Sequence, residues 1–446
     1  MGFNLQIEES LYEYSKSLPV IDYHNHLSLK DISENKRYTD IYDLWISPDP
    51  YKHRAMRMCG VAENYITGDA SNEEKFFKWC ETVPKLIGNP LRTWSHMELS
   101  FVFGIDEKIT GENAEFIYNR CNTFLAENKI TVSTLLDKFN VEYACPCASL
   151  TDDITCFCDS PRFAPSLRGD DIISPTKDFI RTLGDITGRE INSLSDYISA
   201  VSMRLSDFKK CGCSFSDHAL DNGFKFYSDD EKNEERFKKL QDNNLEKCEK
   251  ERLASYILEF LGSQYAKLGF TMQLHIGAQR FTSTRLREIA GPAGGFAGIG
   301  NSVDVNSLTT FLDSLEQGEN GLPKVVIFTL NPADNALVSV LSGSYSKEGT
   351  AGLITQGPAW WWCDHKLGIT DVLENTAAFG VLSNFIGMTT DSRSFLSFVR
   401  HDYFRKILCD WIGKKVGCGD FPNDPDALKS VIFKMCYKNA KEQVQG

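Results

Sequence analysis

The sequence of 446 residues lacks an excess of basic side chains and lacks a long apolar run. Lys and Arg together number 48 against 61 Asp and Glu, so the formal net charge is -13. Phosphate binding needs clustered basic residues, and this acidic balance therefore argues against a nucleic-acid partner. No run of about eighteen apolar residues occurs, which excludes a transmembrane helix. The N-terminus has no cationic stretch followed by an apolar core, so we expect a cytoplasmic protein without a membrane partner.

Cysteine, in contrast, is frequent, with 14 residues. Without a secretory signal we expect reduced thiols rather than disulfides. Three Cys-x-Cys pairs occur, at Cys145 and Cys147, Cys156 and Cys158, and Cys211 and Cys213. They lack the Cys-x-x-Cys spacing of zinc ribbons, so we interpret them as structural and leave a redox or second metal role as the alternative.

Short apolar runs rich in Val, Ile and Phe recur between longer stretches of helical period. This alternation is typical of a parallel sheet with crossover helices. The runs lie at residues 18–23, 141–145, 163–167, 213–217, 270–275, 324–330, 352–356 and 383–389. Eight strands close a (β/α)8 TIM barrel, so we predict an α/β fold of that class. In such a barrel, polar residues that follow the strands converge at one mouth, where the chemistry takes place.

The interval between the first two runs is far longer than one crossover helix requires. Apolar residues three and four apart predict helices at residues 51–59, 72–83, 113–127 and 131–138. We therefore expect residues 27–140 to form a mostly helical insertion over the barrel mouth. The barrel itself would comprise residues 1–26 and 141–446.

Two histidines, His24 and His26, end the first run. Alternate residues of an extended strand share a side, so both imidazoles can bind one metal ion. The eighth run ends at Asp391, and Arg393 follows it. Two imidazoles and one carboxylate with open positions are typical of a catalytic metal site. The structural alternatives are that Asp391 caps the helix expected after it and that Arg393 pairs with Asp391.

Other polar or aromatic residues follow the remaining runs. They are Arg168, Asp217, His218, His275, Arg280, Trp360 and Trp361. His275 precedes Gly277, which allows a ligand to approach closely, whereas a buried, hydrogen-bonded histidine is the alternative. Because consecutive side chains diverge, the triplet Trp360, Trp361 and Trp362 cannot pack into one core, and at least one is expected to line a pocket or interface.

Several longer stretches resemble the uronate isomerase (glucuronate isomerase) family of the amidohydrolase superfamily. They are IDYHNHLS, YITGDAS, VPKLIGNPL, QLHIGAQR, LNPADN, AWWW and GMTTDSRSFLSFVRHDYFR. Together they extend over nearly the whole chain, and the last is long and specific. The resemblance implies a distorted (β/α)8 barrel with a helical domain inserted after the first strand.

The resemblance also implies roles for individual residues. By position, His24, His26 and Asp391 look like the family's metal ligands, and Arg393 looks like the arginine near the reacting end of the sugar. Arg168 and Arg280 look like binders of the substrate carboxylate or hydroxyls, and His275 looks like the pocket histidine. Trp360 and Trp361 are expected beside the substrate. Tyr51 matches the active-site tyrosine, and Asp391, Arg393 and Tyr51 are the catalytic candidates.

One position departs from the family pattern. Where the family reads Asp-His-Tyr, this chain has Asp49, Pro50 and Tyr51. Proline cannot transfer a proton through its side chain. His53 lies one helical turn further along, and we hypothesise that it substitutes in part. The alternative is a member with altered substrate or reduced activity.

The activity implied by the resemblance is aldose-ketose isomerisation of D-glucuronate to D-fructuronate, and of D-galacturonate to D-tagaturonate. The reaction would proceed by proton transfer between C2 and C1, with a hydride shift as the alternative. One divalent metal ion is expected, for which zinc is the first choice, although iron, manganese and cobalt fit the ligand types comparably. Large barrels of this type often associate, so we expect a homo-oligomer.

Two other function classes are open from the sequence. One is a mononuclear metal-dependent hydrolase of the same superfamily, and the other is a catalytically inactive binding protein. Binuclear hydrolases usually carry Lys or Glu at the fourth strand and His at the sixth. Here the fourth run ends in Asp217 and His218, and the sixth ends in Thr329, Leu330 and Asn331, which argues for one metal ion.

Overall fold

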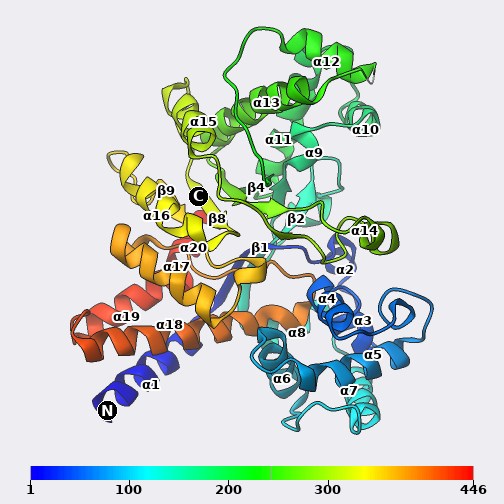
Figure 1. The fold of residues 1–446 in the computed structure, drawn as a ribbon, viewed down its shortest axis with the longest axis vertical. Helices are drawn as coiled ribbons and strands as arrows, with labels where there is room; N and C mark the ends of the chain where they lie inside the picture. Colours follow the sequence, from blue (N-terminus) through cyan, green and yellow to red (C-terminus); the bar gives the residue numbers. More distant parts are fainter. Residues whose placement is uncertain (1, 243, 445–446) are drawn as a thin grey trace.

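The computed structural model describes residues 2–242 and 244–444 and shows a curled parallel sheet surrounded by helices (Figure 1). Neighbouring strands pair in the order β1-β2-β3-β4-β5-β8-β9. The strands of this sheet are β1 (Val20–Asn25), β2 (Val141–Ser149), β3 (Ser166–Arg168), β4 (Phe215–Leu220), β5 (Thr271–Ile276), β8 (Val325–Thr329) and β9 (Ile354–Gln356). A separate antiparallel pair joins β6 (Ala278–Gln279) to β7 (Gly298–Ile299). The predicted α/β class with a TIM-barrel-like sheet is confirmed.

The first seven predicted runs each overlap a strand, but the prediction that the eighth run forms a strand is wrong. Residues 383 and 384 are the end of a 3-10 helix (Leu382–Asn384). The residues after them run beside β1 without forming a ladder. Gly387 interrupts the extended conformation with φ 95°, and a Cβ there would lie 2.0 Å from the Met435 carbonyl oxygen. The segment is attached to β1 by side chains instead, because the Asp22 carboxylate accepts the Thr390 N–H at 2.7 Å.

The chain between β1 and β2 is helical, and all four helices predicted there are present. These helices lie together at the lower right of Figure 1, in blue and cyan. They are α2 (Leu29–Ser33), α3 (Ile41–Trp45), α4 (Pro50–Met58), α5 (Asn72–Thr82), α6 (Pro90–Phe103), α7 (Ala114–Glu127) and α8 (Val132–Lys138). The start of α5 illustrates why they form locally: Ser71 and Glu74 make a reciprocal capping box that satisfies two free backbone N–H groups.

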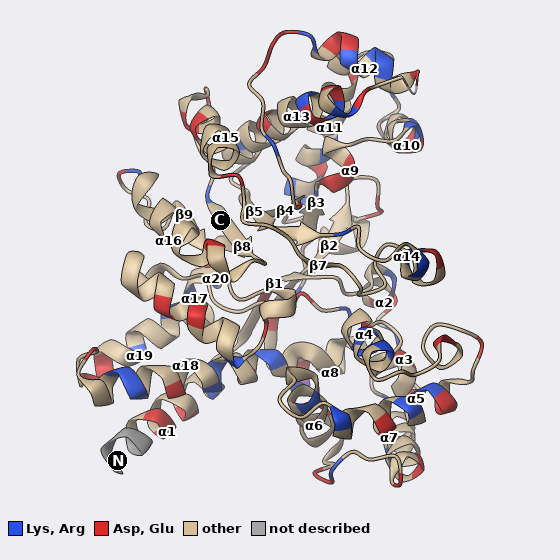
Figure 2. Ribbon diagram, viewed as in Figure 1, with Lys and Arg blue, Asp and Glu red and all other residues tan. Residues whose placement is uncertain are grey.

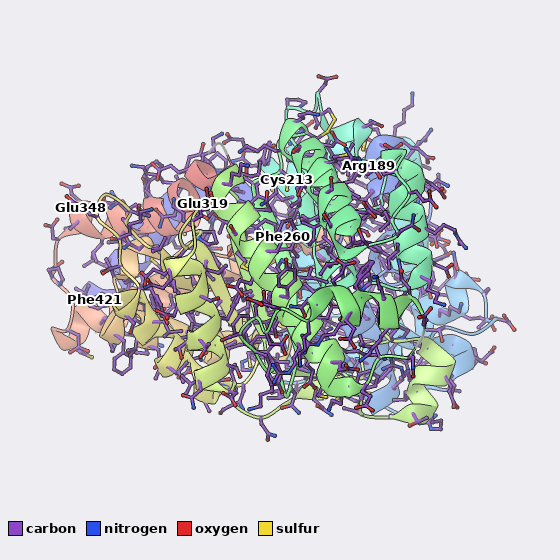
Figure 3. The ribbon with its side chains drawn as sticks, turned by 90° about the horizontal axis from the view of Figure 1, so that it is seen from above. Arg189, Cys213, Phe260, Glu319, Glu348 and Phe421 are labelled. Carbon is purple, nitrogen blue, oxygen red and sulfur yellow. A yellow bond between two sulfur atoms is a disulfide. The ribbon has the colours of Figure 1, made fainter. Side chains whose placement is uncertain are left out.

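The other helices pack around the sheet or extend from it. They are α1 (Gly2–Ser17), α9 (Asp170–Ile173), α10 (Lys177–Thr187), α11 (Leu194–Lys210), α12 (Asn233–Gln241), α13 (Lys247–Leu268), α14 (Thr284–Ala290), α15 (Val305–Gln317), α16 (Asn335–Ser344), α17 (Lys366–Phe379), α18 (Val399–Cys418), α19 (Pro425–Phe433) and α20 (Asn439–Val444). Helices α13 and α15 lie side by side, near the labelled Phe260 and Glu319 (Figure 3). They approach closely because Gly262 has no side chain, and a Cβ there would lie 2.6 Å from Leu315 Cδ1.

The centre of the barrel is apolar, whereas charge lies mostly on the peripheral helices. Inward-facing residues of several strands form one buried cluster that includes Tyr23, Cys145, Phe215 and Phe328. Figure 2 shows Lys and Arg interleaved with Asp and Glu along outer helices such as α5, α12 and α18. Among the described residues, none of the helices is both long and apolar enough to cross a membrane.

Two cysteines contradict the expectation that all thiols are reduced. Cys158 and Cys211 form a disulfide, while the other cysteines are free. Each belongs to a different Cys-x-Cys pair, and each lies at the end of a helical segment. Arg204 of α11 donates to the carbonyl oxygens of Leu150 and Asp152, which brings the loop before Cys158 onto the helix. Spacing along the chain could not indicate a pairing that this tertiary contact creates.

Candidate active site

A cavity of about 500 Å³ opens at the carboxyl ends of the strands. All but one of the site residues predicted from the sequence line this cavity. The residues that do so are His24, His26, Tyr51, Arg168, His275, Arg280, Trp360, Trp361, Asp391 and Arg393. The exception is His53. Residues from distant parts of the chain thus meet at the mouth, as a barrel requires.

The floor of the cavity brings together His24, His26 and Asp391. The Oδ1 atom of Asp391 lies 3.2 Å from His24 Nε2 and 3.1 Å from His26 Nε2. Two ligands bound to one zinc ion at about 2.1 Å lie about 3.4 Å apart in a tetrahedron. Asp391 Oδ1 is thus spaced from each imidazole nitrogen almost as two ligands of one ion are, and these nitrogen and oxygen donors suit a divalent ion.

Asp391 also receives two hydrogen bonds on its other oxygen. Tyr51 donates its hydroxyl to Oδ2 at 3.1 Å, and Trp360 donates its indole N–H at 2.9 Å. Burial alone raises the pKa of the Asp391 carboxyl, but the hydrogen bonds from His24 and His26 outweigh burial and hold that pKa well below its usual range. Asp391 does not cap a helix, since Ser394 accepts the Leu396 N–H at the start of the next helical turn.

A second polar pair, His275 and Asp217, stands beside the first group. His275 Nδ1 donates to Asp217 Oδ1 at 2.7 Å, and the other ring nitrogen, Nε2, is buried without a hydrogen-bond partner. Burial, which outweighs the Asp217 charge, lowers the pKa of His275, so the imidazole is neutral near pH 7. The ring is fixed between Phe328 and Trp360, with centroids 4.3 and 4.6 Å away. His275 therefore has one free lone pair at the cavity.

The neighbouring His218 faces the other way. Its Nε2 lies 3.0 Å from the Tyr265 hydroxyl, behind the sheet wall. Adjacent strand residues alternate sides, so only Asp217 of the pair reaches the cavity.

Cys147, one of the paired cysteines that we interpreted from the sequence as structural, lies beside His24 and Asp217, and its place at the site was missed. It lies on β2, its Sγ is 3.5 Å from His24 Nδ1, and it is 3.8 Å from Asp217 Oδ2. Burial raises the pKa of the Cys147 thiol, but the imidazoles of His24 and His26 outweigh burial and leave that pKa below its usual range. The signal was present: β2 continues past Cys145, and Cys147 lies two residues further along the same face.

Three of the arginines that line the cavity were predicted from the sequence, and Arg287 and Arg400 line it as well. Arg168 lies 3.5 Å from Asp170, and Arg280 donates to Asp221 at 3.0 Å while its guanidinium lies 5.6 Å from the centre of the Trp361 ring. Arg393 follows Asp391 by two residues and also lines the cavity. Each guanidinium has five N–H donors, so one carboxylate partner leaves donors free for a ligand.

The three consecutive tryptophans diverge as expected. Trp360 is buried and bonded to Asp391, Trp361 lines the cavity, and Trp362 donates its indole N–H to the Ala297 carbonyl. The divergence follows from a left-handed backbone at Trp361, with φ 53°.

Helix α4 delivers Tyr51 but not His53 to the cavity. Asp49 caps the helix by accepting the Tyr51 N–H, and Pro50 fits the first helical turn because a free N–H is not needed there. Tyr51 and Pro50 line the cavity. His53 lies on another face and is half-buried, its Nε2 is buried without a partner, and burial lowers the pKa of its imidazole to about 4. The position of His53 gives no support to direct proton transfer to a ligand.

Arg400 is a second residue that sequence reasoning missed. This buried guanidinium donates to the Thr390 carbonyl at 2.9 Å and lies 5.2 Å from the centre of the Tyr51 ring. It therefore braces both the segment that carries Asp391 and the tyrosine that donates to Asp391. Arg400 lies within the stretch GMTTDSRSFLSFVRHDYFR, but it does not follow a predicted strand, so its place at the site was not predicted.

Comparisons with known proteins agree with this site. A model of the glucuronate isomerase family matches residues 3–444. The chain is 39% identical to the uronate isomerase of Caldicellulosiruptor saccharolyticus over 452 aligned positions, which cover 98% of this chain and 97% of that protein. The crystal structure of a uronate isomerase from Thermotoga maritima superimposes with a TM-score of 0.91 at 28% identity, covering 98% of this chain and 97% of the other.

A glucuronate isomerase structure from Caulobacter crescentus shares the fold with the same TM-score of 0.91, at 22% identity, covering 99% of this chain and 94% of the other. These matches do not favour the hydrolase alternative. The site and the matches lead to one conclusion: the chain belongs to the glucuronate isomerase (uronate isomerase) family.

Proposed function

We propose that this chain isomerises a hexuronate between its aldose and ketose forms, with D-glucuronate and D-galacturonate as substrates and D-fructuronate and D-tagaturonate as products. One observation carries the proposal: a single cavity joins the donor set of His24, His26 and Asp391 to three guanidinium groups. A hexuronate has a carbonyl at C1 and a carboxylate at the other end. A site for such a substrate therefore needs an electrophile beside the carbonyl and cationic side chains beside the carboxylate.

We propose that His24, His26 and Asp391 hold one divalent ion, with zinc as the first choice. The fit rests on the distances of 3.2 and 3.1 Å from Asp391 Oδ1 to the two imidazole nitrogens and on the nitrogen and oxygen chemistry of the three donors. When bound, such an ion supplies Lewis-acid polarisation of a carbonyl oxygen. Asp391 accepts from Tyr51 and Trp360 on its other oxygen, and these bonds fix the carboxylate in place.

The substrate carboxylate would be bound by Arg168 and Arg280, whose planar guanidinium groups suit bidentate pairing. Arg393, two residues from Asp391, would face the reacting end and stabilise negative charge on the C1 and C2 oxygens. Trp360 and Trp361 would pack against the sugar and exclude water.

Isomerisation requires that a proton leaves C2, that its electron pair forms the C1–C2 double bond of an enediolate, and that a proton returns to C1. We propose the neutral His275 as an acceptor for the C2 proton, because its Nε2 lone pair is free and Asp217 stabilises the imidazolium that forms. Asp391 is the other candidate base, but it already accepts from Tyr51 and Trp360 on Oδ2. Burial raises the pKa of Tyr51 well above its usual value, so its hydroxyl stays protonated, and it would donate to a sugar oxygen only in exchange for its bond to Asp391.

We further propose that residues 27–140 act as one helical subdomain whose helix α4 completes the cavity with Tyr51. The cytoplasmic location, the homo-oligomeric state and the absence of a nucleic-acid partner stay predictions.

The test is isomerisation of both hexuronates by the purified protein, followed by NMR. Substrate carrying deuterium at C2 distinguishes the two routes, because proton transfer releases label to solvent and a hydride shift moves it to C1. We expect turnover of at least one hexuronate with loss of label. No turnover of either compound by the metal-loaded protein would contradict the proposal.

A further inference from the structure

We propose that Cys147 is a metal ligand, and that with His24 and His26 it forms a second, sulfur-containing donor set for a thiophilic divalent ion such as Zn²⁺ or Co²⁺. This inference goes beyond the proposed function. It concerns metal binding alone, so loss of isomerase activity and loss of sulfur coordination are separate results.

The first argument is distance. One ligand atom from each of His24, His26 and Cys147 lies within 4.8 Å of the other two. Cys147 Sγ is 3.5 Å from His24 Nδ1. A sulfur at about 2.3 Å and a nitrogen at about 2.05 Å from one tetrahedral zinc ion are about 3.6 Å apart. The observed separation is thus that of two ligands of one ion.

The second argument is position on the sheet. Cys145 and Cys147 lie on the same side of β2, and Cys145 belongs to the apolar cluster inside the barrel. Cys147 is one interior layer nearer the mouth, beside the end of β1. Cys145 is fully enclosed, whereas Cys147 is partly exposed and an ion can reach it.

The two edges of the His24 ring separate this donor set from the one with Asp391. His24 presents Nε2 to the Asp391 carboxylate and Nδ1 to the Cys147 thiol. An ion bound to His24 Nδ1 can also bind the Cys147 sulfur, whereas an ion bound to His24 Nε2 can also bind an Asp391 oxygen. Because both sets need His26, they compete, and the softer ions favour the thiolate.

A different group, made of His24, Asp217 and His275, also has closely spaced donor atoms. Its His275 Nδ1 and Asp217 Oδ1 are only 2.7 Å apart, the separation of a hydrogen bond, so they share a proton rather than an ion. At Cys147 the thiol proton leaves to solvent as the metal–sulfur bond forms, and His24 Nδ1 exchanges its contact with the thiol for one with the ion.

The test uses Co²⁺ added in one equivalent to the metal-free full chain, with absorption spectroscopy as the readout. We expect a sulfur-to-cobalt charge-transfer band in the near ultraviolet for the wild type. Cys147→Ser should lose at least about nine-tenths of that band, because a hydroxyl does not give it. Cys145→Ser, which removes a buried thiol from the same face of the same strand, should keep it.

A cobalt-loaded wild type without this band, or a band that persists in Cys147→Ser, would overturn the proposal. A second measurement needs no variant. Alkylation of the wild type, mapped by mass spectrometry, should be at least about tenfold slower at Cys147 with Co²⁺ bound and should recover with chelator. Exposed Cys156 is the internal control, and equal alkylation of Cys147 with and without the ion would also overturn the proposal.

Discussion

The barrel wall is built in two different ways on its two sides. From β4 through β5 to β8 the strands pair in continuous register, with partners such as Ser216 and Met272 or Leu274 and Ile327. Where the wall closes between β1 and residues 385–393, only two backbone hydrogen bonds connect the chains, Asp391 N–H to His24 O and His26 N–H to Ser392 O. The buried Asp22 carboxylate adds three more contacts by accepting from the Thr389 hydroxyl and from the N–H and hydroxyl of Thr390. We call this region the seam and the β4-β5-β8 side the ladder.

The difference shows why Asp391 lies where it does. Asp391 has φ 48°, a left-handed conformation that a regular strand does not allow. Because the seam does not pair as a ladder, its backbone can turn at Asp391 and point the carboxylate toward both His24 and His26. On the ladder, Asp217 and His275 lie on strands that pair regularly with their neighbouring strands. This regular pairing fixes the positions of the two side chains. In the proposed mechanism, the seam would supply the metal ligands and the ladder the proton acceptor.

The largest effect is expected from Asp391→Asn on the seam. The variant loses a charged ligand, so we expect metal occupancy to fall and kcat/KM for the hexuronate to drop by about 1000-fold or more. Metal analysis alongside steady-state kinetics measures both. Full metal content with near-normal turnover would show that the seam does not hold the catalytic ion.

On the ladder, His275→Gln should lower kcat by about 100-fold, the range of a lost general base. Metal occupancy should stay at the wild-type level, which separates proton transfer from metal binding. Asp217→Asn is the matched variant and should share the defect, since it removes the acceptor that orients His275. If His275→Gln lost its metal instead, the division between seam and ladder would be wrong.

The seam should also matter more for stability. Asp22 accepts hydrogen bonds from Asn25, from both the N–H and the hydroxyl of Thr390, and from His401. Asp22→Asn should therefore reduce the free energy of unfolding by about 2–3 kcal/mol. Gln273→Met, at a buried polar position on the ladder whose amide oxygen has no partner, should cost less than about 1 kcal/mol. Urea denaturation compares the two, and equal losses would remove the contrast.

The smallest effect is expected at His53, which belongs to neither region. Turnover of His53→Gln should stay within about threefold of wild type, because His53 lies outside the cavity. Burial holds the pKa of folded His53 at about 4, below its usual 6.5. As pH falls below 6.5 the unfolded chain binds a proton that the folded chain does not, so wild-type stability declines.

By about pH 5.5 this decline amounts to about 1 kcal/mol, and His53→Gln should not share it. Denaturation at about pH 7 and at about pH 5.5 gives the measurement. A large loss of turnover in His53→Gln would instead restore the hypothesis that this histidine replaces the one absent at Pro50.

The ladder was predictable from sequence, and the seam was not. Strands such as β5 and β8 are short, β-branched apolar runs between helical stretches, and periodicity identifies them directly. Residues 383–389 also form a short, partly apolar run after a helical stretch, although they include Asn384 and Gly387. Nothing in that composition indicates that Met435 would crowd Gly387 or that Asp22 would take the place of a ladder partner.

For the candidate site, a residue's distance from a predicted strand end mattered more than this division, since His24, His26 and Asp391 of the seam were all predicted. Residues directly after a strand, such as His26 and Arg280, were found because strand ends converge. Cys147 was missed because β2 extends beyond the apolar run that indicated it, and Arg400 because it reaches the site from a helix. His53 was predicted from helical spacing alone, which does not say which face of α4 meets the cavity.

The central claim is that the three donors on the floor of the cavity hold an ion that the isomerisation needs. The most direct measurement is the rate of hexuronate isomerisation before chelation, after chelation, and after one equivalent of Zn²⁺ is restored. We predict a loss of about 1000-fold or more on chelation and recovery on restoration, both absent in Asp391→Asn. Unchanged turnover by chelated protein that analysis shows to be metal-free would contradict the account.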